Sequence, residues 1–139
     1  MTQVSEIQLR FEDEEELRLG GFCDPLEGVM DSVRRSSAAF TAEHEGEVLA
    51  YWGVREDCIV GGRASVWCLS TPAMDRYPRH AARESLMLLE SLLQTHYHLT
   101  CIVDSEYTRA VRWLEWLGFE RGPKIGRLME MHIMRGGAA

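Results

Sequence analysis

The sequence lacks the features that mark several large classes of protein. No apolar run is long enough to span a bilayer, and no basic stretch followed by apolar residues forms a secretory leader. No CxxC pair occurs, and no spacing of cysteine and histidine is typical of a zinc site. We therefore expect a soluble cytoplasmic protein that binds no metal and whose four cysteines are reduced thiols. These are Cys23, Cys58, Cys68 and Cys101.

Basic residues are too few for a nucleic-acid-binding surface. The chain has 15 lysines and arginines against 22 aspartates and glutamates, a formal net charge of −7. Because contact with nucleic-acid phosphates requires a basic face, this balance argues against a general nucleic-acid binder. Residues 12–16 form one acidic run. The run favours a solvated first turn of a helix, with a docking surface for a partner as the alternative.

Length and apolar content are those of one folded domain. The 139 residues are 45% hydrophobic, which is enough for a sizeable core and leaves no room for a second domain. No internal repeat, linker or low-complexity tract occurs. We therefore predict a single domain over residues 1–139.

The spacing of apolar residues predicts a mixed α/β (α+β) fold. Strands are expected at residues 7–11, 39–44, 48–54, 63–70, 99–103 and 127–134, with a further extended segment from Phe119. Helices are expected at residues 12–19, 25–33, 78–96 and 106–117. This order indicates a largely antiparallel sheet. One parallel pair is predicted between strands 63–70 and 99–103, because the helix between them supplies the crossover that such a pair requires.

Helix faces and turns can also be predicted. Asp24 precedes Pro25 and stands where an N-cap belongs. The apolar face of that helix is expected to contain Leu26, Val29, Met30 and Val33. The long helix is expected to pack through a ridge that includes Leu86. Turns are expected at residues 45–46 and 122–123.

Residues 99–119 join a buried strand to an amphipathic helix. Residues 99–103 are apolar and β-branched. Apolar residues three and four apart then form one helical face: Ala110, Trp113, Leu114 and Leu117. Asp104 or Ser105 can cap this helix, and Gly118 stands where a left-handed glycine ends one.

This segment carries a family resemblance. Ala110-Val111 through Leu117-Gly118-Phe119 resembles the Ala-Ile-x-Leu-Tyr-x-x-x-Gly-Phe motif of the GNAT superfamily of N-acyltransferases. It is also similar to short GNAT-like proteins of tailed phages, of the internal virion protein A type, which carry a comparable Val-Asp…Arg-Trp-Leu…Gly-Phe run. The resemblance implies a GNAT-like sheet with helices on both faces, acetyl-CoA or coenzyme A as cofactor, and an amine as acceptor.

The phosphate-binding loop that the resemblance implies is incomplete. Family members hold the coenzyme A pyrophosphate on a glycine-rich loop at a helix start, but no glycine occurs between Gly62 and Gly118. By resemblance, the pantetheine arm pairs with the backbone of Cys68, Leu69 and Ser70. The phosphates would lie at Arg76, Tyr77, Arg79, His80 and Ala81.

The basic residues at this helix start have two interpretations. Together with Arg83 they favour either an anion site or a solvated helix face. Flexible arginine side chains hold a phosphate less well than a preformed loop does, because ordering them costs entropy. We expect any coenzyme A binding to be weak, sensitive to salt, and lost when Arg76 and Arg79 are replaced together.

The catalytic positions match the family in part. Leu114 occupies the position of the family's general-acid tyrosine, so Tyr107 is the candidate acid, with packing at a helix start as the alternative. Glu43 is the candidate base, with neighbouring His44 as another and a surface role as the alternative for both. His96 and His98 lack a third ligand for a metal.

Two functions fit these residues. One is acyl-coenzyme A-dependent N-acetyltransferase activity, weak or absent because the cofactor loop is degenerate. The other is a non-catalytic role in phage assembly, through contacts with phage or host proteins. Binding of coenzyme A discriminates between the two.

Overall fold

The protein was analysed as a computed structural model that describes residues 8–22, 24–58 and 62–136. Two helices come first, α1 (Phe11–Leu19) and α2 (Pro25–Arg35), followed by three strands, β1 (Ala38–His44), β2 (Glu47–Cys58) and β3 (Arg63–Ser70). A short 3-10 helix, η1 (Pro72–Arg76), leads into the long helix α3 (Pro78–Thr95). The chain ends with β4 (His98–Asp104), α4 (Thr108–Leu117), β5 (Glu120–Ile125) and β6 (Leu128–Met134).

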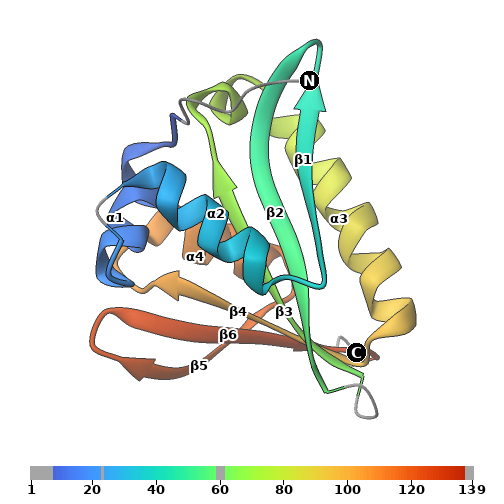
Figure 1. Ribbon diagram of the computed structural model, residues 1–139. Helices are drawn as coiled ribbons and strands as arrows, with labels where there is room; N and C mark the ends of the chain where they lie inside the picture. Colours follow the sequence, from blue (N-terminus) through green and yellow to red (C-terminus); the bar gives the residue numbers. More distant parts are fainter. Residues whose placement is uncertain (1–7, 23, 59–61, 137–139) are drawn as a thin grey trace.

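The strands form one six-stranded sheet in the order β1-β2-β3-β4-β6-β5. Every neighbouring pair is antiparallel except β3 and β4, which are parallel and joined through α3. Helices α1 and α2 lie on one face of the sheet, and α3 and α4 lie on the other (Figure 1). The predicted mixed, largely antiparallel sheet with one parallel pair and helices on both faces is therefore confirmed.

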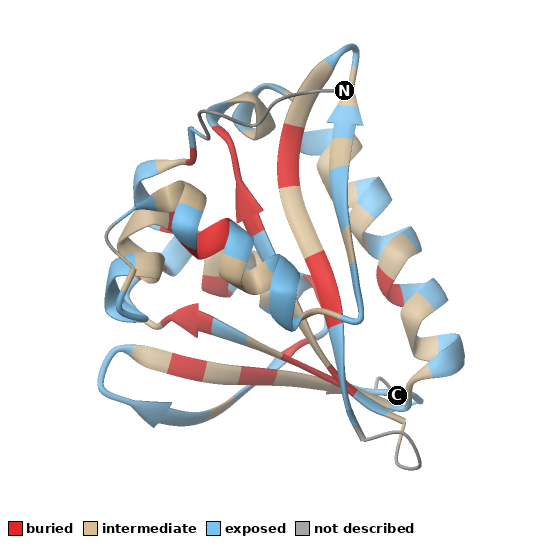
Figure 2. Ribbon diagram, viewed as in Figure 1, coloured by how far each residue is buried: buried red, intermediate tan, exposed pale blue. Residues whose placement is uncertain are grey.

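The two faces bury cores of different size. On the α3 and α4 side, Leu89 and Val111 pack against strand residues that include Leu99 and Met131. On the α1 and α2 side the buried cluster is small and consists of Leu9, Val29 and Leu69. Figure 2 shows the buried positions concentrated on the central strands. Because burial of apolar area drives folding, most of the stability comes from the α3 and α4 side.

The helices are less buried than their periodicity predicts. Met30 and Val33 on α2 are 48% and 39% exposed, and Leu86 on α3 is 42% exposed. On α2 the buried residues are Gly28 and Val29. A side chain at Gly28 would come within 2.7 Å of the Leu17 side chain, so this glycine lets α1 approach closely and turns α2 away from its predicted face.

The predicted first strand is wrong within the part of the chain that the structure describes. Residues 8–10 belong to no strand, Phe11 already begins α1, and residue 7 lies outside the described ranges. One strand-like contact is present, since the Arg10 N–H donates to the Ser70 carbonyl at 2.9 Å. The carboxylates after Phe11 favour a helix start there, because they lie at the positive end of the helix dipole.

Two further local predictions are wrong. Helix α4 begins at Thr108 rather than at residue 106, and neither Asp104 nor Ser105 is its N-cap. The Asp104 side chain accepts hydrogen bonds from the Glu106 N–H at 3.0 Å, before the helix begins, and from Arg127 at 2.6 Å. The predicted turn at residues 122–123 lies inside β5 at a shift of register, and Gly126, with φ 60°, lies in the turn between β5 and β6.

Other local predictions are confirmed. Glu45 and Gly46, with φ values of 50° and 80°, turn the chain between β1 and β2. Asp24 caps α2 by accepting a hydrogen bond from the Leu26 N–H at 3.1 Å. Gly118 has a φ of 111° and ends α4 in the left-handed conformation. Among the residues described, no helix is long and apolar enough to cross a membrane.

Candidate functional site

The two parallel strands separate part-way along their length. Pairing is confined to three positions, Arg63 with His98, Ala64 with Leu99 and Ser65 with Thr100. Beyond them, β3 and β4 diverge and leave the sheet open like a V (Figure 1). The backbone groups that face this gap have no strand partner among the described residues. Because backbone N–H and C=O groups need hydrogen-bond partners, an extended ligand is well suited to lie there.

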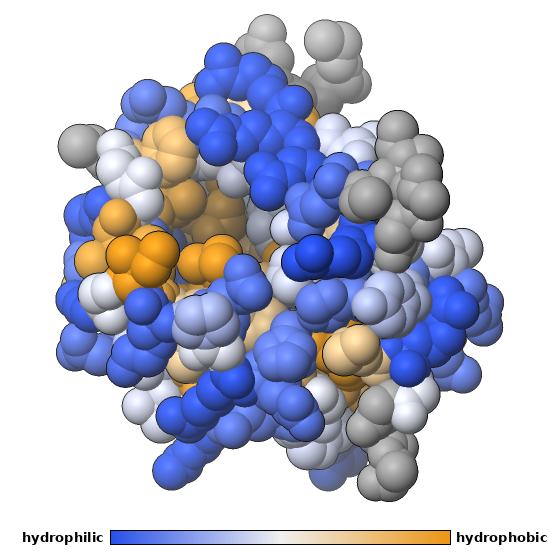
Figure 3. All heavy atoms as spheres, turned by 90° about the horizontal axis from the view of Figure 1, so that it is seen from below, coloured by the Kyte–Doolittle hydropathy of each residue, from blue (hydrophilic) through white to orange (hydrophobic). Residues whose placement is uncertain are grey.

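A cavity of about 1100 Å³ lies at the open end of the V. Its lining is mostly apolar and comes from both faces of the sheet. Several apolar side chains in its wall are exposed, among them Met87 (58%), Ile102 (56%) and Trp116 (57%). Seen from below, the surface is hollowed beside a group of apolar side chains (Figure 3). A large apolar cavity with few polar groups is the usual form of a small-molecule site.

Helix α1 places two carboxylates in the cavity wall, on successive turns. Asp13 is 3% exposed, and the Ser70 backbone donates a hydrogen bond to it. Burial raises the pKa of Asp13 from 3.8 to about 6, against the opposing effect of Arg10. Burial, together with the nearby charges of Asp13 and Asp104, raises the pKa of Glu16 from 4.5 to about 8. A carboxyl group with a pKa of about 8 holds its proton at neutral pH and exchanges it at slightly higher pH, within the range useful for acid–base catalysis.

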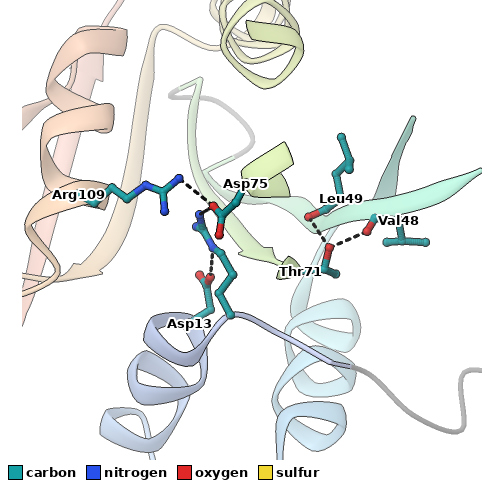
Figure 4. Close-up of polar contacts among 7 residues, drawn as sticks. Asp13, Val48, Leu49, Thr71, Asp75 and Arg109 are labelled. Carbon is teal, nitrogen blue, oxygen red and sulfur yellow. Dashed lines mark hydrogen bonds and ion pairs between the residues drawn. The ribbon is translucent and has the colours of Figure 1, made fainter. Parts of the chain in front are cut away.

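A chain of ion pairs crosses the open end of the V (Figure 4). The Arg10 guanidinium bonds to Asp13 at 2.9 Å and to Asp75 of η1 at 3.2 Å. Asp75 also binds Arg109 of α4 at 2.7 Å. Arg10 lies over the ring of Tyr107, 5.8 Å from its centroid. The network therefore connects α1, the segment after β3 and the helix after β4.

Comparison with solved structures identifies the fold. A spermidine N-acetyltransferase variant from Vibrio cholerae is similar with a TM-score of 0.61 and 16% identity over 93% of this chain and 95% of that one. The GNAT domain of the S. lividans protein PAT gives a TM-score of 0.60 with 12% identity, over 76% of this chain and 68% of that one. The chain has the GNAT fold.

The GNAT likeness extends to a structure with bound ligands. Spermidine N-acetyltransferase from Vibrio cholerae in complex with CoA and spermine has a TM-score of 0.59 and 16% identity over 79% of this chain and 73% of that one. No protein-family model and no curated protein matches the sequence. The predicted similarity to GNAT proteins is thus confirmed for the fold, while the closeness to the phage proteins stays a prediction.

The predicted pantetheine-binding strand lies at the cavity, but its three residues differ. Cys68 is open to the cavity, whereas Leu69 is buried in the small core on the α1 and α2 side. Ser70 is buried, and its carbonyl accepts the hydrogen bond from Arg10. Although Cys68 borders open space, the protein around it is dense, and this desolvation raises the pKa of the thiol to about 12.

The predicted phosphate residues are only partly free to bind an anion. Arg76 is paired with Glu47. His80 packs against His44 with ring centroids 3.9 Å apart, and Tyr77 contacts the same histidine at 4.6 Å. Arg79 is exposed and has no ion pair among the described residues. Of this group, only His80 and Ala81 line the cavity.

The two candidate catalytic residues both line the cavity, in different surroundings. Tyr107 is 7% exposed, and burial raises its pKa to about 12. Glu43 is exposed on β1. Leu114, at the family's tyrosine position, also borders the cavity. Within the described parts of the chain, no group of residues could hold a metal ion.

The sequence analysis missed the cavity carboxylates. The acidic run was predicted to be solvated, but Asp13 is buried and Glu16 lines the cavity. The outward side chains of the run include Glu14 and Glu15, which pair with Arg18. A signal was present, because residues 13, 16 and 17 are spaced three and four apart and so share one face of a helix.

Proposed function

We propose that this protein transfers an acyl group from a coenzyme A thioester to an amine. The observation that carries the proposal is the open end of the V, where β3 and β4 no longer pair with each other and the gap between them borders the cavity. The apolar side chains exposed in the cavity wall support it, since a domain rarely leaves such a surface uncovered without a ligand.

The residues around the V fit a coenzyme A thioester. The backbone of residues 68–70 runs along the gap and would pair with the pantetheine arm at Cys68, since the Ser70 N–H and carbonyl already bond to Asp13 and Arg10. The first turn of α3 would face the phosphates, although Pro78 offers no N–H there. The bound thioester supplies an acyl group that is activated toward attack by an amine.

Glu16 is assigned the role of general base. Its carboxyl group lies in the cavity wall, accepts a hydrogen bond from the Asp104 backbone and forms no ion pair among the described residues, so the ammonium of an acceptor can supply the opposite charge. With a pKa of about 8, Glu16 becomes the carboxylate that takes a proton from an amine as the pH rises toward 8, so turnover should increase over this range. Glu43 remains a second candidate, but it is exposed on β1.

Tyr107 is assigned the role of general acid, as its sequence position suggested. Its pKa of about 12 keeps the phenol protonated at neutral pH, so it has a proton to donate. Its place at the start of α4 puts it in the cavity wall, where Arg10 lies over its ring. The acceptor is proposed to be an amine, in line with the spermine complex of a protein that shares this fold.

Binding and turnover are the tests of this proposal. Isothermal titration should show acetyl-CoA binding with a dissociation constant of roughly 0.1–1 mM, since the phosphate loop lacks glycine. Amine-dependent release of the coenzyme A thiol should be measurable, and Glu16→Gln should lower kcat by about 100-fold or more with unchanged binding. Glu12→Gln, an exposed position on the same helix, is the matched control.

Each result has a definite meaning. No binding of acetyl-CoA at millimolar concentration would overturn the proposal. Binding without turnover for any amine would support the non-catalytic alternative. The cytoplasmic location and the phage origin inferred from the sequence stay predictions.

A further inference from the structure

One carboxylate at the cavity mouth holds two arginines that come from different elements. Asp75 Oδ1 accepts hydrogen bonds from Arg109 Nη2 at 2.7 Å and from Arg10 Nη1 at 3.2 Å (Figure 4). Asp75 belongs to η1, which follows β3, and Arg109 lies in the first turn of α4, which follows β4. Both arginines line the cavity. The pair with Arg109 therefore spans the open end of the V.

The bond between Asp75 and Arg109 is the exchangeable one. Their side chains are 42% and 64% exposed, and an exposed ion pair contributes little stability. Arg10, by contrast, is 15% exposed and keeps a second partner in Asp13 at 2.9 Å. Among the described residues, Arg109 has only Asp75. Arg109 can therefore exchange Asp75 for another anion without losing any other ion pair.

A phosphate is a stronger partner for this guanidinium than a carboxylate. It carries more charge and offers more oxygens, and arginine binds it through two parallel hydrogen bonds. The opposite lip, at the start of α3, is poorly equipped for this task. Pro78 has no N–H, and Arg76 is already paired with Glu47. Arg79 has no ion pair among the described residues, but it does not line the cavity. Of the two arginines that line the cavity, Arg109 is the easier to release from its carboxylate partner.

We propose that Arg109 binds a phosphate of the coenzyme A thioester, and that Asp75 is a built-in competitor that occupies Arg109 until the phosphate displaces it. The inference rests on the proposed function, because it names a binding residue for that same ligand. It adds a phosphate contact on α4 to the first turn of α3, and it makes Asp75 a residue that weakens binding.

Paired titrations with two ligands test this role. For coenzyme A, Asp75→Asn should tighten binding about three- to fivefold, the range of an exposed ion pair, and Arg109→Gln should weaken it about tenfold. For a phosphate-free thioester, S-acetyl-N-acetylcysteamine, neither substitution should change the affinity. Arg112→Gln, an exposed arginine one turn away on α4, should behave like wild type with both ligands.

Salt dependence supplies a readout independent of absolute affinity. The slope of log Kd against log salt should be smaller for Arg109→Gln than for wild type, because one cation fewer contacts the phosphates. The double replacement of Arg76 and Arg79 should reduce affinity less than Arg109→Gln alone. Thermal melting of each variant confirms that it is folded.

The outcomes separate this inference from the proposed function. If wild type binds coenzyme A and the two substitutions change that affinity by less than twofold, the assignment of Arg109 and Asp75 is wrong while the proposed function stands. Weaker coenzyme A binding by Asp75→Asn would also overturn it, since a competitor cannot assist. If wild type binds neither ligand, the proposed function fails, and this inference fails with it.

Discussion

At their first residues β3 and β4 form a closely packed pair, whereas at their last residues the same strands border a cavity. Ala64 and Leu99, which face each other in the paired half, have no exposed surface. Cys68 and Ile102, in the diverging half, are both exposed. The paired half thus supplies packing energy, and the diverging half gives some of it up to make room for a ligand.

The charges follow the same division. The diverging half collects the buried Asp13, the partly buried Glu16 and the network through Arg10, and burial of ionised groups costs free energy. In the paired half, Ala64 and Leu99 are buried in the main apolar core, and neither carries a charge. Packing energy gained in the paired half therefore offsets the cost of desolvating carboxylates in the diverging half.

The largest expected effect comes from a cavity cut into the paired half. Leu99→Ala should lower the free energy of unfolding by about 2–5 kcal/mol, because a completely buried leucine is replaced by a void. Ile102→Ala, three residues further along β4 and 56% exposed, should cost less than about 1 kcal/mol. Urea denaturation of both variants measures the difference. Equal losses would contradict the division of the strands into two halves.

The stability lost when Glu16 ionises in the diverging half can be measured as a function of pH. Between pH 4.5 and about 8 the folded protein retains the Glu16 proton that the unfolded chain has lost. The free energy of unfolding therefore falls as pH rises through this window and stays reduced above it. Glu16→Gln removes this loss.

The expected result is a variant that is more stable than wild type only at high pH. At pH 9 the gain should be about 1–3 kcal/mol, allowing for screening by water in the cavity, and at pH 4 it should vanish. Denaturation curves at several pH values provide the measurement, with Glu12→Gln as the control. A constant difference across the whole range would refute the pKa assigned to Glu16.

A smaller effect is expected at Gly118, where α4 ends and the chain returns to the sheet. Gly118 has a φ of 111°, and an added Cβ would lie 2.9 Å from Ile133 Cδ1. Gly118→Ala should therefore destabilise the fold by about 1 kcal/mol, because a left-handed residue with a side chain is strained. Since this glycine lies outside the cavity lining, coenzyme A affinity should not change. A loss of affinity without a loss of stability would contradict this reasoning.

The paired half could be predicted from the sequence, because it follows from local patterns. The apolar strands at 63–70 and 99–103 and the helix between them require a parallel crossover pair, and Gly118 marks a helix end. The diverging half could not be predicted in the same way. Its network joins Arg10, Asp75 and Arg109, which lie far apart in the sequence and share no spacing rule.

The acidic run shows why composition misled the interpretation. Carboxylates are rarely buried, so residues 12–16 were all predicted to face water. The fold nevertheless turns Asp13 toward the Ser70 backbone and Glu16 toward the cavity, because α1 lies across the ends of the two diverging strands. That position is set by the sheet and not by the helix itself, so the helix sequence alone could not predict it.

The smallest expected effect on stability is at Cys68 in the diverging half. Cys68→Ala should change the free energy of unfolding by less than about 0.5 kcal/mol, because the side chain borders open space and leaves no new void. The surroundings of Cys68 should instead affect the reactivity of its thiol. Desolvation raises the pKa of this thiol to about 12, so little of it is ionised near neutral pH and alkylation should be slow.

The alkylation rate can be measured with iodoacetamide and peptide-level mass spectrometry, which separates Cys68 from the other three cysteines. Because the thiolate is the reacting form, the rate should rise about tenfold for each pH unit between 7 and 10 without levelling off. Saturating acetyl-CoA should protect Cys68, since the ligand would lie along β3. A rate that reaches a plateau near pH 8 would contradict the raised pKa, and reaction unaffected by acetyl-CoA would place the ligand away from the diverging strands.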